Sequence, residues 1–297
     1  MEKNTAHING ALLIAKAEGV TSHTVISQLR KIPLLHGVRI GHSGTLDPFA
    51  SGLLIALLGH ATRLQEELHL LPKTYQAEIT LGATSDTDDK TGVITPYANP
   101  KIPTYEEVFS ALAHIRTQTE QIPPSYAAIK ISGKKMYEYA REGKSVLKKS
   151  RPIMIYDAVL ESYEYPRIRI SITCSTGTYI RSSARDIGEL LNTGAYCSSL
   201  TRTTIGPFTQ EKARAIQETP TDIAKALVPI ESLVSHIPYI ICNDENVAKY
   251  KQGKQGTCPP NVIANTPIAL LDTNKRLFGI ARCDTTSTTL QPKKIFL

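Results

Sequence analysis

The segment Arg39–Gly52, RIGHSGTLDPFASG, constrains the fold strongly because it places one carboxylate, Asp47, on a shaped loop. Pro48 restricts Asp47 to extended conformations, and the glycines on both sides allow backbone shapes and close approaches that other residues resist. The segment is therefore a loop rather than a regular element. Asp-Pro and Ser-Gly pairs also occur in plain turns, so a chemical role for Asp47 needs support from the rest of the chain.

Length and composition exclude several classes of protein. The chain has 297 residues, 41% of them apolar, which is enough for one large core or two domains of an ordinary globular protein. The apolar run near the start, ALLIA, is far too short to span a membrane, and no signal-peptide pattern precedes it. We therefore expect a cytoplasmic protein with no membrane partner.

The cysteines predict neither a disulfide framework nor a structural zinc site. Their number is odd, they are widely spaced, and no two of them form a C-x-x-C pair. We expect all of them to be reduced and mostly structural: Cys174, Cys197, Cys242, Cys258 and Cys283.

Positive charge is concentrated in one segment. The formal net charge is +7, and residues 130–151 carry +6 of it, with eight lysines and arginines against two glutamates. Such a charge run is usually only a solvated face. Here Tyr126, Tyr137 and Tyr139 lie beside or among the cations and add rings that can stack on exposed bases. A nucleic acid is therefore the expected partner.

Apolar periodicity predicts both strands and helices. An apolar strand followed by a turn is expected in 8–22, a buried apolar element in 51–64, and alternating strands over 73–82 and 167–175. Helices are expected over 23–32 with Thr21 or Ser22 as the cap, over 104–115, and after a turn in 177–192. After about residue 235, short strands and turns predict a small separate β module.

The acidic turn TSDTDDKTG, residues 84–92, resembles a calcium loop at its start only. From Asp86 two ligand positions match, but Lys90 occupies the fifth position and Tyr97 stands where the bidentate glutamate belongs. We expect no metal site there.

Arg181 is a candidate partner for Asp47. It stands in the first turn of a predicted helix, where the helix dipole disfavours cations. An ordinary solvent-facing arginine would explain it. Alternatively, a partly enclosed carboxylate needs a nearby cation, because burial alone raises the pKa of a carboxyl group and an adjacent arginine lowers it. Asp47 and Arg181 would form such a pair.

Five segments together resemble the TruB-type tRNA pseudouridine synthases, a family that converts uridine 55 in the TΨC loop to pseudouridine. They are GHSGTLDPFASGLLIALLGHATR, KTYQAEITLGATSDTDDKTG, IPPSYAAIKISGKKMYEYAREG, GTYIRSSARDIG and LTRTTIGPF, and the likeness covers about residues 8–235. The resemblance implies an α+β fold with a mixed, largely antiparallel sheet flanked by helices. It also implies a catalytic domain over 1–235, with a basic RNA-clamping insertion at about 124–152, and a small PUA-like β domain over 236–297.

The resemblance implies a reaction that needs one carboxylate and no cofactor or metal. By the family pattern, Asp47 is the catalytic residue, Arg181 its ion-pair partner, and Tyr75 the ring that stacks on the flipped uracil. The carboxylate would either attack the sugar or the base covalently, or remove a sugar proton to give a glycal, and the sequence does not choose between these routes.

The resemblance also implies residues that bind the RNA. His42 matches a histidine that fills the space of the flipped nucleotide or holds that nucleotide. Arg63 stands where lysine is frequent and keeps a phosphate-binding charge. Tyr179 and Leu200 match positions that line the pocket, although simple core packing would also explain them. Basic residues of the insertion complete the set: Lys130, Lys134 and Lys135.

One turn departs from the family pattern. The family has Asp-Lys-Pro where this chain has Ala15, Lys16 and Ala17. Loss of the aspartate and proline should loosen the turn rather than abolish catalysis.

Other functions remain open at this stage. An RNA-binding protein or tRNA-folding chaperone would explain the basic segment but has no use for Asp47, Tyr75 and Arg181 together. A glycosidase ordinarily needs two opposed carboxylates, and no second one accompanies Asp47 in these motifs. A relative could act on another RNA under a guide. We expect a monomer that acts alone on the TΨC stem-loop of tRNA and needs no protein partner.

Overall fold

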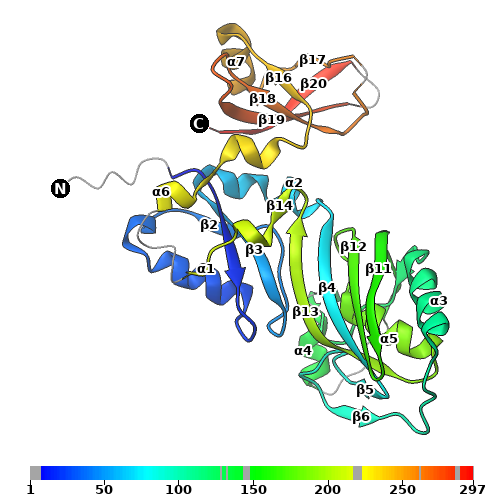
Figure 1. The fold of residues 1–297 in the computed structure, drawn as a ribbon. Helices are drawn as coiled ribbons and strands as arrows, with labels where there is room; N and C mark the ends of the chain where they lie inside the picture. Colours follow the sequence, from blue (N-terminus) through cyan, green and yellow to red (C-terminus); the bar gives the residue numbers. More distant parts are fainter. Residues whose placement is uncertain are drawn as a thin grey trace.

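The protein is described by a computed structural model over residues 8–127, 129–131, 133–142, 148–216, 223–260, 262–284 and 288–296. Nine strands form one sheet in the order β11-β12-β4-β13-β3-β1-β15, with β14 on β13 and β2 on β3 (Figure 1). Of these pairings only that of β13 with β3 is parallel, so the predicted α+β class with a mixed, largely antiparallel sheet is confirmed. The strands are β1 (Gly10–Lys16), β2 (Ile40–His42), β3 (Ser51–Leu58), β4 (Lys73–Leu81), β11 (Ile155–Glu164), β12 (Arg167–Cys174), β13 (Ala195–Ile205), β14 (Phe208–Thr209) and β15 (Val228–Pro229).

The three predicted helices are present and cover the sheet. They are α1 (Ser22–Arg30), α3 (Tyr105–Arg116) and α5 (Ile180–Leu190). Thr21 caps α1 by accepting a hydrogen bond from the backbone N–H of Thr24, and Thr104 and Glu107 form a capping box on α3. The apolar face of α5 packs against β13, while α3 packs against β11 (Figure 1). None of the described helices combines the length and apolarity needed to cross a bilayer.

Short elements connect these parts. The helical ones are α2 (Gln65–His69), α4 (Met136–Arg141), α6 (Ile223–Ala226), and the 3-10 turns η1 (Pro33–Leu35), η2 (Gly59–Leu64), η3 (Gln210–Lys212) and η5 (Ile230–Val234). Three two-stranded antiparallel sheets are formed by β5 (Ala83–Ser85) with β6 (Ile94–Pro96), β7 (Glu120–Gln121) with β10 (Arg151–Pro152), and β8 (Lys130–Ile131) with β9 (Lys134–Lys135).

The two halves of the large sheet meet at the parallel contact between β13 and β3. Two residue pairs make this contact, Thr201 with Ser51 and Arg202 with Gly52. Gly52 has a φ of +107°, and a Cβ at this position would lie 2.3 Å from the carbonyl oxygen of Arg202. Glycine is therefore required for this close approach. The loop that carries Asp47 leads directly into β3, so it lies beside this contact.

The C-terminal module, residues 239–296, forms its own five-stranded sheet. Its order is β16-β18-β19-β20-β17, and the expected short strands after about residue 235 are present (Figure 1). The elements are β16 (Tyr239–Ile241), α7 (Asp244–Lys251), β17 (Gly256–Thr257), β18 (Pro267–Leu271), β19 (Leu277–Cys283) and β20 (Thr289–Ile295), of which the helix α7 was not expected. The exact domain boundary at 235 stays a prediction.

The C-terminal module docks on α2 through a buried carboxylate. Glu67, whose side chain is 1% exposed, accepts hydrogen bonds from Lys294 Nζ at 2.8 Å with both of its oxygens. Arg282 Nη2 lies 3.8 Å from the same carboxylate. Beside this network the apolar side chains of Leu277 and Phe296 share a core cluster with β1 and β3. Charge pairing and apolar burial therefore hold the module against the large sheet.

Lys294→Met should lower the free energy of unfolding by about 3 kcal/mol, because it leaves the buried carboxylate of Glu67 without its closest cation. The matched control is Glu66→Gln, which removes an exposed partner of the same lysine and should cost less than about 1 kcal/mol. Urea denaturation measures both changes. Equal losses in the two variants would contradict the assignment of Glu67 as the residue that holds the module.

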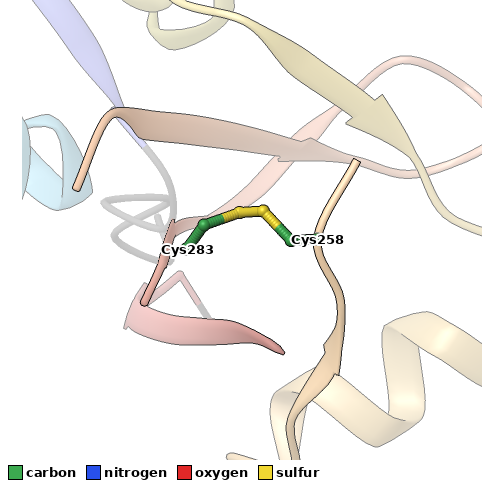
Figure 2. Close-up of a disulfide and its surroundings, with 2 residues drawn as sticks. All are labelled: Cys258 and Cys283. Atoms are coloured by element: carbon green, nitrogen blue, oxygen red, sulfur yellow. A yellow bond between two sulfur atoms is a disulfide. The ribbon is translucent and has the colours of Figure 1, made fainter. Parts of the chain in front are cut away.

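The expectation that all cysteines are reduced is wrong for two of them. Cys258, just after β17, and Cys283, at the end of β19, form a disulfide with a Cα–Cα distance of 5.7 Å (Figure 2). The two lie 25 residues apart in the chain, so their proximity depends on the pairing of β19 and β17 with β20, which no cysteine spacing reveals. Cys174, Cys197 and Cys242 are free and buried, and burial raises the pKa of the Cys174 thiol to about 11.

The disulfide predicts a thiol count. Without reductant, the denatured protein should react with a thiol reagent at three cysteines, and after reduction at all five. Cys258→Ser should lower the free energy of unfolding by about 3 kcal/mol, since the cross-link closes a loop of intermediate length. Five reactive thiols in the unreduced, denatured protein would show that the bond does not form.

Candidate active site

A cavity of about 390 Å³ opens beside the contact between β13 and β3. Its walls come from the loop before β3, from β4 and β13, and from the loop that leads into α5. Its lining includes Gly44, Thr45, Asp47, His69, Lys73, Tyr75, Ile129, Arg151, Tyr179, Leu200 and Arg202. Asp47, Tyr75, Tyr179 and Leu200, which are distant in sequence, thus share one cavity.

Asp47 and Arg181 form the predicted ion pair. Arg181 Nε lies 2.9 Å from Oδ2 of Asp47, and the side chains are 3% and 34% exposed respectively. The contact lacks hydrogen-bond alignment, since this N–H of Arg181 has no hydrogen-bond acceptor. Within the described part of the chain, neither carboxylate oxygen of Asp47 accepts a hydrogen bond. Both oxygens therefore stay available to a substrate while the guanidinium supplies positive charge beside them.

A second carboxylate holds Arg181 from its other end. Arg181 Nη1 lies 3.5 Å from Oδ2 of Asp89, whose side chain is 6% exposed, and donates to the carbonyl oxygen of Thr87 at 3.0 Å. Nη2 donates to the carbonyl oxygen of Tyr126 at 3.2 Å. Asp89 does not line the cavity. The acidic turn over 84–92 therefore positions the guanidinium, a role that its likeness to a calcium loop did not indicate.

Four side chains from two adjacent strands form the floor of the cavity. Lys73 and Tyr75 are two residues apart on β4, and Leu200 and Arg202 are two apart on β13, so each pair lies on one face of the sheet. Arg202 lies directly opposite Tyr75 in the register. Burial raises the pKa of the Tyr75 hydroxyl, which keeps the ring neutral. Leu200 is buried in the core and also lines the cavity, and its contact with a substrate stays a prediction.

Arg202 shapes the loop that carries Asp47. Its buried guanidinium donates to the carbonyl oxygens of Gly44 at 3.1 Å, Thr45 at 3.4 Å and Leu53 at 2.9 Å. A fixed planar set of donors thereby holds three backbone positions on either side of Asp47. The loop is not stabilised by its own turn residues alone.

Tyr179 is the N-cap residue of α5. Its backbone N–H donates to Oε1 of the buried Gln121 at 2.9 Å, and its ring lies 6.0 Å from the Cζ of Arg181. Burial raises the pKa of the Tyr179 hydroxyl, and the charge of Asp47 raises it further. The ring therefore closes the side of the cavity next to the ion pair.

Comparison with known proteins assigns the family. The sequence signature of the TruB family pseudouridylate synthase N-terminal domain matches residues 31–180, half of the chain. A protein of Bacillus licheniformis named tRNA pseudouridine synthase B is 41% identical over 258 residues, 82% of each chain. This chain belongs to the TruB family of pseudouridylate synthases. A second relative with the same name, from Aromatoleum aromaticum, is 36% identical and covers 97% of this chain and 92% of its own.

Solved structures show the same fold as this TruB-family enzyme. A structure titled as an H/ACA RNP bound to a substrate RNA containing 2'-deoxyuridine matches with a TM-score of 0.75 at 22% identity, over 97% of this chain and 85% of the other. A Cbf5-Nop10-Gar1 complex matches with a TM-score of 0.78 at 23% identity, over 100% and 88% of the two chains. At this identity the likeness supports the pseudouridine synthase fold alone. The expected enzyme class, an isomerase of the TruB family, is confirmed by the family match.

The turn that departs from the TruB family pattern is held by a buried lysine. Lys16 Nζ donates to the carbonyl oxygens of Ala17 at 2.9 Å, Val20 at 2.7 Å and Pro48 at 3.4 Å. Burial lowers the pKa of Lys16 to about 8, and Asp47 raises it in part. The ammonium therefore joins this turn to the Asp47 loop although Ala15 and Ala17 replace the aspartate and proline.

Two predicted RNA-binding residues of the TruB-family enzyme lie outside the cavity lining. His42 ends β2, and its Nδ1 accepts a hydrogen bond from the backbone N–H of Gly44 at 3.4 Å; burial, then Arg202, lowers its pKa. Arg63 lies at the junction with the C-terminal module, where it donates to the carbonyl oxygen of Ile295 and lies 5.7 Å from the ring centroid of Phe296. RNA contacts of His42 and Arg63 stay predictions.

The basic insertion contributes to the cavity wall. Ile129 and Arg151, from the expected insertion at about 124–152, line the cavity. The backbones of Lys130, Lys134 and Lys135 form the β8–β9 pair. Their side chains, and residues 143–147, lie outside the described residues, so the RNA contacts predicted there remain untested.

Sequence reasoning missed four residues of the site: His69, Lys73, Asp89 and Arg202. The signal for Lys73 was its place two residues before Tyr75 on an alternating strand. Asp89 and Arg202 lie within quoted family segments, but only the fold shows that their charges are buried beside Asp47 and Arg181. Across the described residues, no three histidine, cysteine, aspartate or glutamate side chains are grouped as metal ligands.

Proposed function

We propose that this TruB-family enzyme isomerises uridine 55 in the TΨC loop of tRNA to pseudouridine. The observation that carries the proposal is that Asp47, which lines a cavity whose floor includes Tyr75, forms an ion pair with the buried Arg181 behind it. The names of the relatives, tRNA pseudouridine synthase B, support tRNA as the substrate class. The position within tRNA rests on the sequence resemblance.

The cavity has the size and lining to take one flipped nucleotide. A buried reaction on a base requires that base to leave its stack, at a cost of a few kcal/mol. The ring of Tyr75 offers a stacking surface, and Leu200 and Tyr179 offer apolar contacts that offset part of this cost.

The reaction then needs a single carboxylate. The C1′–N1 bond breaks and its electron pair stays on uracil, where N1 later takes up a proton. Asp47 either forms a covalent bond, which breaks again before the product leaves, or removes a sugar proton, which it returns when C1′ bonds to C5. The base turns, C1′ bonds to C5, and the C5 proton is released. Nothing is oxidised or reduced, so no redox cofactor enters the balance. Arg181 holds Asp47 in position and supplies positive charge beside it.

RNA binding draws on the cations around the cavity mouth. Arg151 lines the cavity, and the basic insertion from which it comes carries most of the net charge. If about six phosphates are neutralised, raising salt from about 50 to 200 mM should weaken binding on the order of a thousandfold.

The direct test is a tRNA transcript labelled with tritium at C5 of uracil. The purified protein should release tritium to water, and nuclease digestion should yield pseudouridine at position 55. Binding without release would identify an RNA-binding protein or chaperone. Release from other positions would identify a synthase for another RNA site, and free uracil would identify a hydrolase.

A further inference from the structure

Lys73 is a buried cation without a carboxylate partner. It begins β4 and is 4% exposed. Within the described residues, no aspartate or glutamate lies within ion-pair distance of its Nζ. Buried lysines are rare unless they are paired, because removing an ammonium from water is costly. Its charge therefore calls for an explanation in the chemistry of the site.

One N–H of the Lys73 ammonium has no acceptor among the described residues. It donates to the carbonyl oxygen of Leu71 at 2.7 Å and to that of His69. An ammonium has three donors, and among the described residues no third acceptor is present. Lys16, the other buried lysine near the site, differs because three carbonyl oxygens accept its three donors. Lys73 lines the cavity, so its remaining donor is available to a ligand there.

The remaining donor belongs to a side chain that lines the cavity beside the expected stacking ring, Tyr75. Lys73 and Tyr75 share one face of β4, which separates them by about 6.6 Å along the strand. That distance is within the reach of a lysine side chain from a pyrimidine stacked on the tyrosine ring. Lys73 is buried in the floor of the cavity, away from the exposed surface that the phosphates of a bound RNA would contact.

We infer that Lys73 is a further catalytic residue, which donates a hydrogen bond from its ammonium group to a carbonyl oxygen of the flipped uracil and stabilises the negative charge that develops there. This inference rests on the proposed function. When the C1′–N1 bond breaks, the electron pair left on the ring spreads over N1 and the two carbonyl oxygens. A fixed cation in a water-poor cavity stabilises that charge more than it stabilises the neutral base. No proton has to leave Lys73.

The test measures the rate of the reaction and the affinity for tRNA separately. With C5-tritiated tRNA, Lys73→Met should lower the single-turnover rate constant of tritium release on the order of a hundredfold and leave the Kd for tRNA unchanged. Lys73→Gln keeps donors but no charge and should be equally slow, whereas Lys73→Arg should regain part of the rate. Lys31→Met, an exposed lysine at the end of α1, is the matched control and should behave as wild type.

The pH profile of the reaction distinguishes an effect of the Lys73 charge from an effect of its packing. Burial lowers the pKa of Lys73 to about 8. Arg202 on β13 also lowers this pKa, whereas Cys174 on β12 raises it. Two further titratable groups near Lys73, His69 on α2 and Asp47 on the loop before β3, line the same cavity. The protonated form is the active one, so kcat/KM of the wild type should fall as pH rises through about 8. Lys73→Met should lack this fall. A fall that persists unchanged in Lys73→Met would contradict the inference, and Lys16, whose pKa is also about 8, would then be the next lysine to test.

Several outcomes would overturn the inference. They are a wild-type rate in Lys73→Met, full recovery in Lys73→Gln, or a loss confined to the Kd, which would indicate a phosphate contact. The thermal midpoint of each variant shows whether it folds. No tritium release by the wild type would instead contradict the proposed function itself, so the two failures are distinguishable.

Discussion

Asp47→Asn should reduce tritium release from C5-labelled tRNA by at least about 10⁴-fold, the scale of loss when a group that acts directly on the reacting atoms is removed. The amide has nearly the same shape as the carboxylate but carries no charge and is a poor nucleophile and base. Binding should persist, because the contacts with phosphates do not depend on Asp47. Single-turnover release and filter binding with the same transcript measure both quantities.

The control for this variant is Asp157→Asn on the exposed edge strand β11. It changes the formal charge by the same amount and should leave turnover unchanged. Release at the wild-type rate by Asp47→Asn would contradict the assignment of Asp47. Loss of turnover in both variants would point to an effect of net charge on RNA binding instead.

Arg181→Met should lower the free energy of unfolding by about 3–5 kcal/mol, because Asp89 would remain buried without its cation. The carbonyl oxygens of Thr87 and Tyr126 would also lose their donor. Turnover should fall on the order of a thousandfold, since Asp47 would lose both its position and the adjacent charge. Urea denaturation measures stability, and tritium release at a temperature where the variant is folded measures turnover.

A second substitution separates the two effects. Arg181→Met combined with Asp89→Asn removes the unpaired buried charge, so it should regain part of the stability and stay inactive. Arg185→Met is the matched control, since Arg185 lies one turn later on α5 and pairs with Asp88 at 2.8 Å outside the cavity. It should lose stability and keep its turnover. Recovery of turnover in the double variant would show that Arg181 serves folding alone.

Elements with one buried face could be predicted from the sequence, and others could not. β4 and β12 alternate because each has its apolar residues on the core side. β11 escaped prediction because it is an edge strand with much of its surface exposed. β13 carries serines and threonines that bond to β4, such as Thr204 to Thr74, so its pattern is polar where an apolar alternation is expected.

Some residues of the site could likewise be predicted from the sequence, and others could not. Asp47, Tyr75 and Arg181 stand within distinctive segments, and the Asp47–Arg181 pairing follows from the cost of an isolated buried charge. The roles of Asp89 and Arg202 depend on contacts between distant parts of the chain, which are those of Asp89 with Arg181 and of Arg202 with the carbonyl oxygen of Leu53. The same limit applies to the disulfide of Cys258 and Cys283, which strand pairing brings together.

Gly52 has a consequence for the chemistry, although it touches none of the reacting groups. It lets β3 and β13 lie close enough to pair through only two positions. Asp47 is carried by the half of the sheet on one side of this contact, and Tyr75 by the half on the other. The distance between the Asp47 carboxylate and the Tyr75 ring, where a nucleotide would lie, therefore depends on the absence of a side chain at position 52. Any side chain there would push β3 and β13 apart and increase this distance.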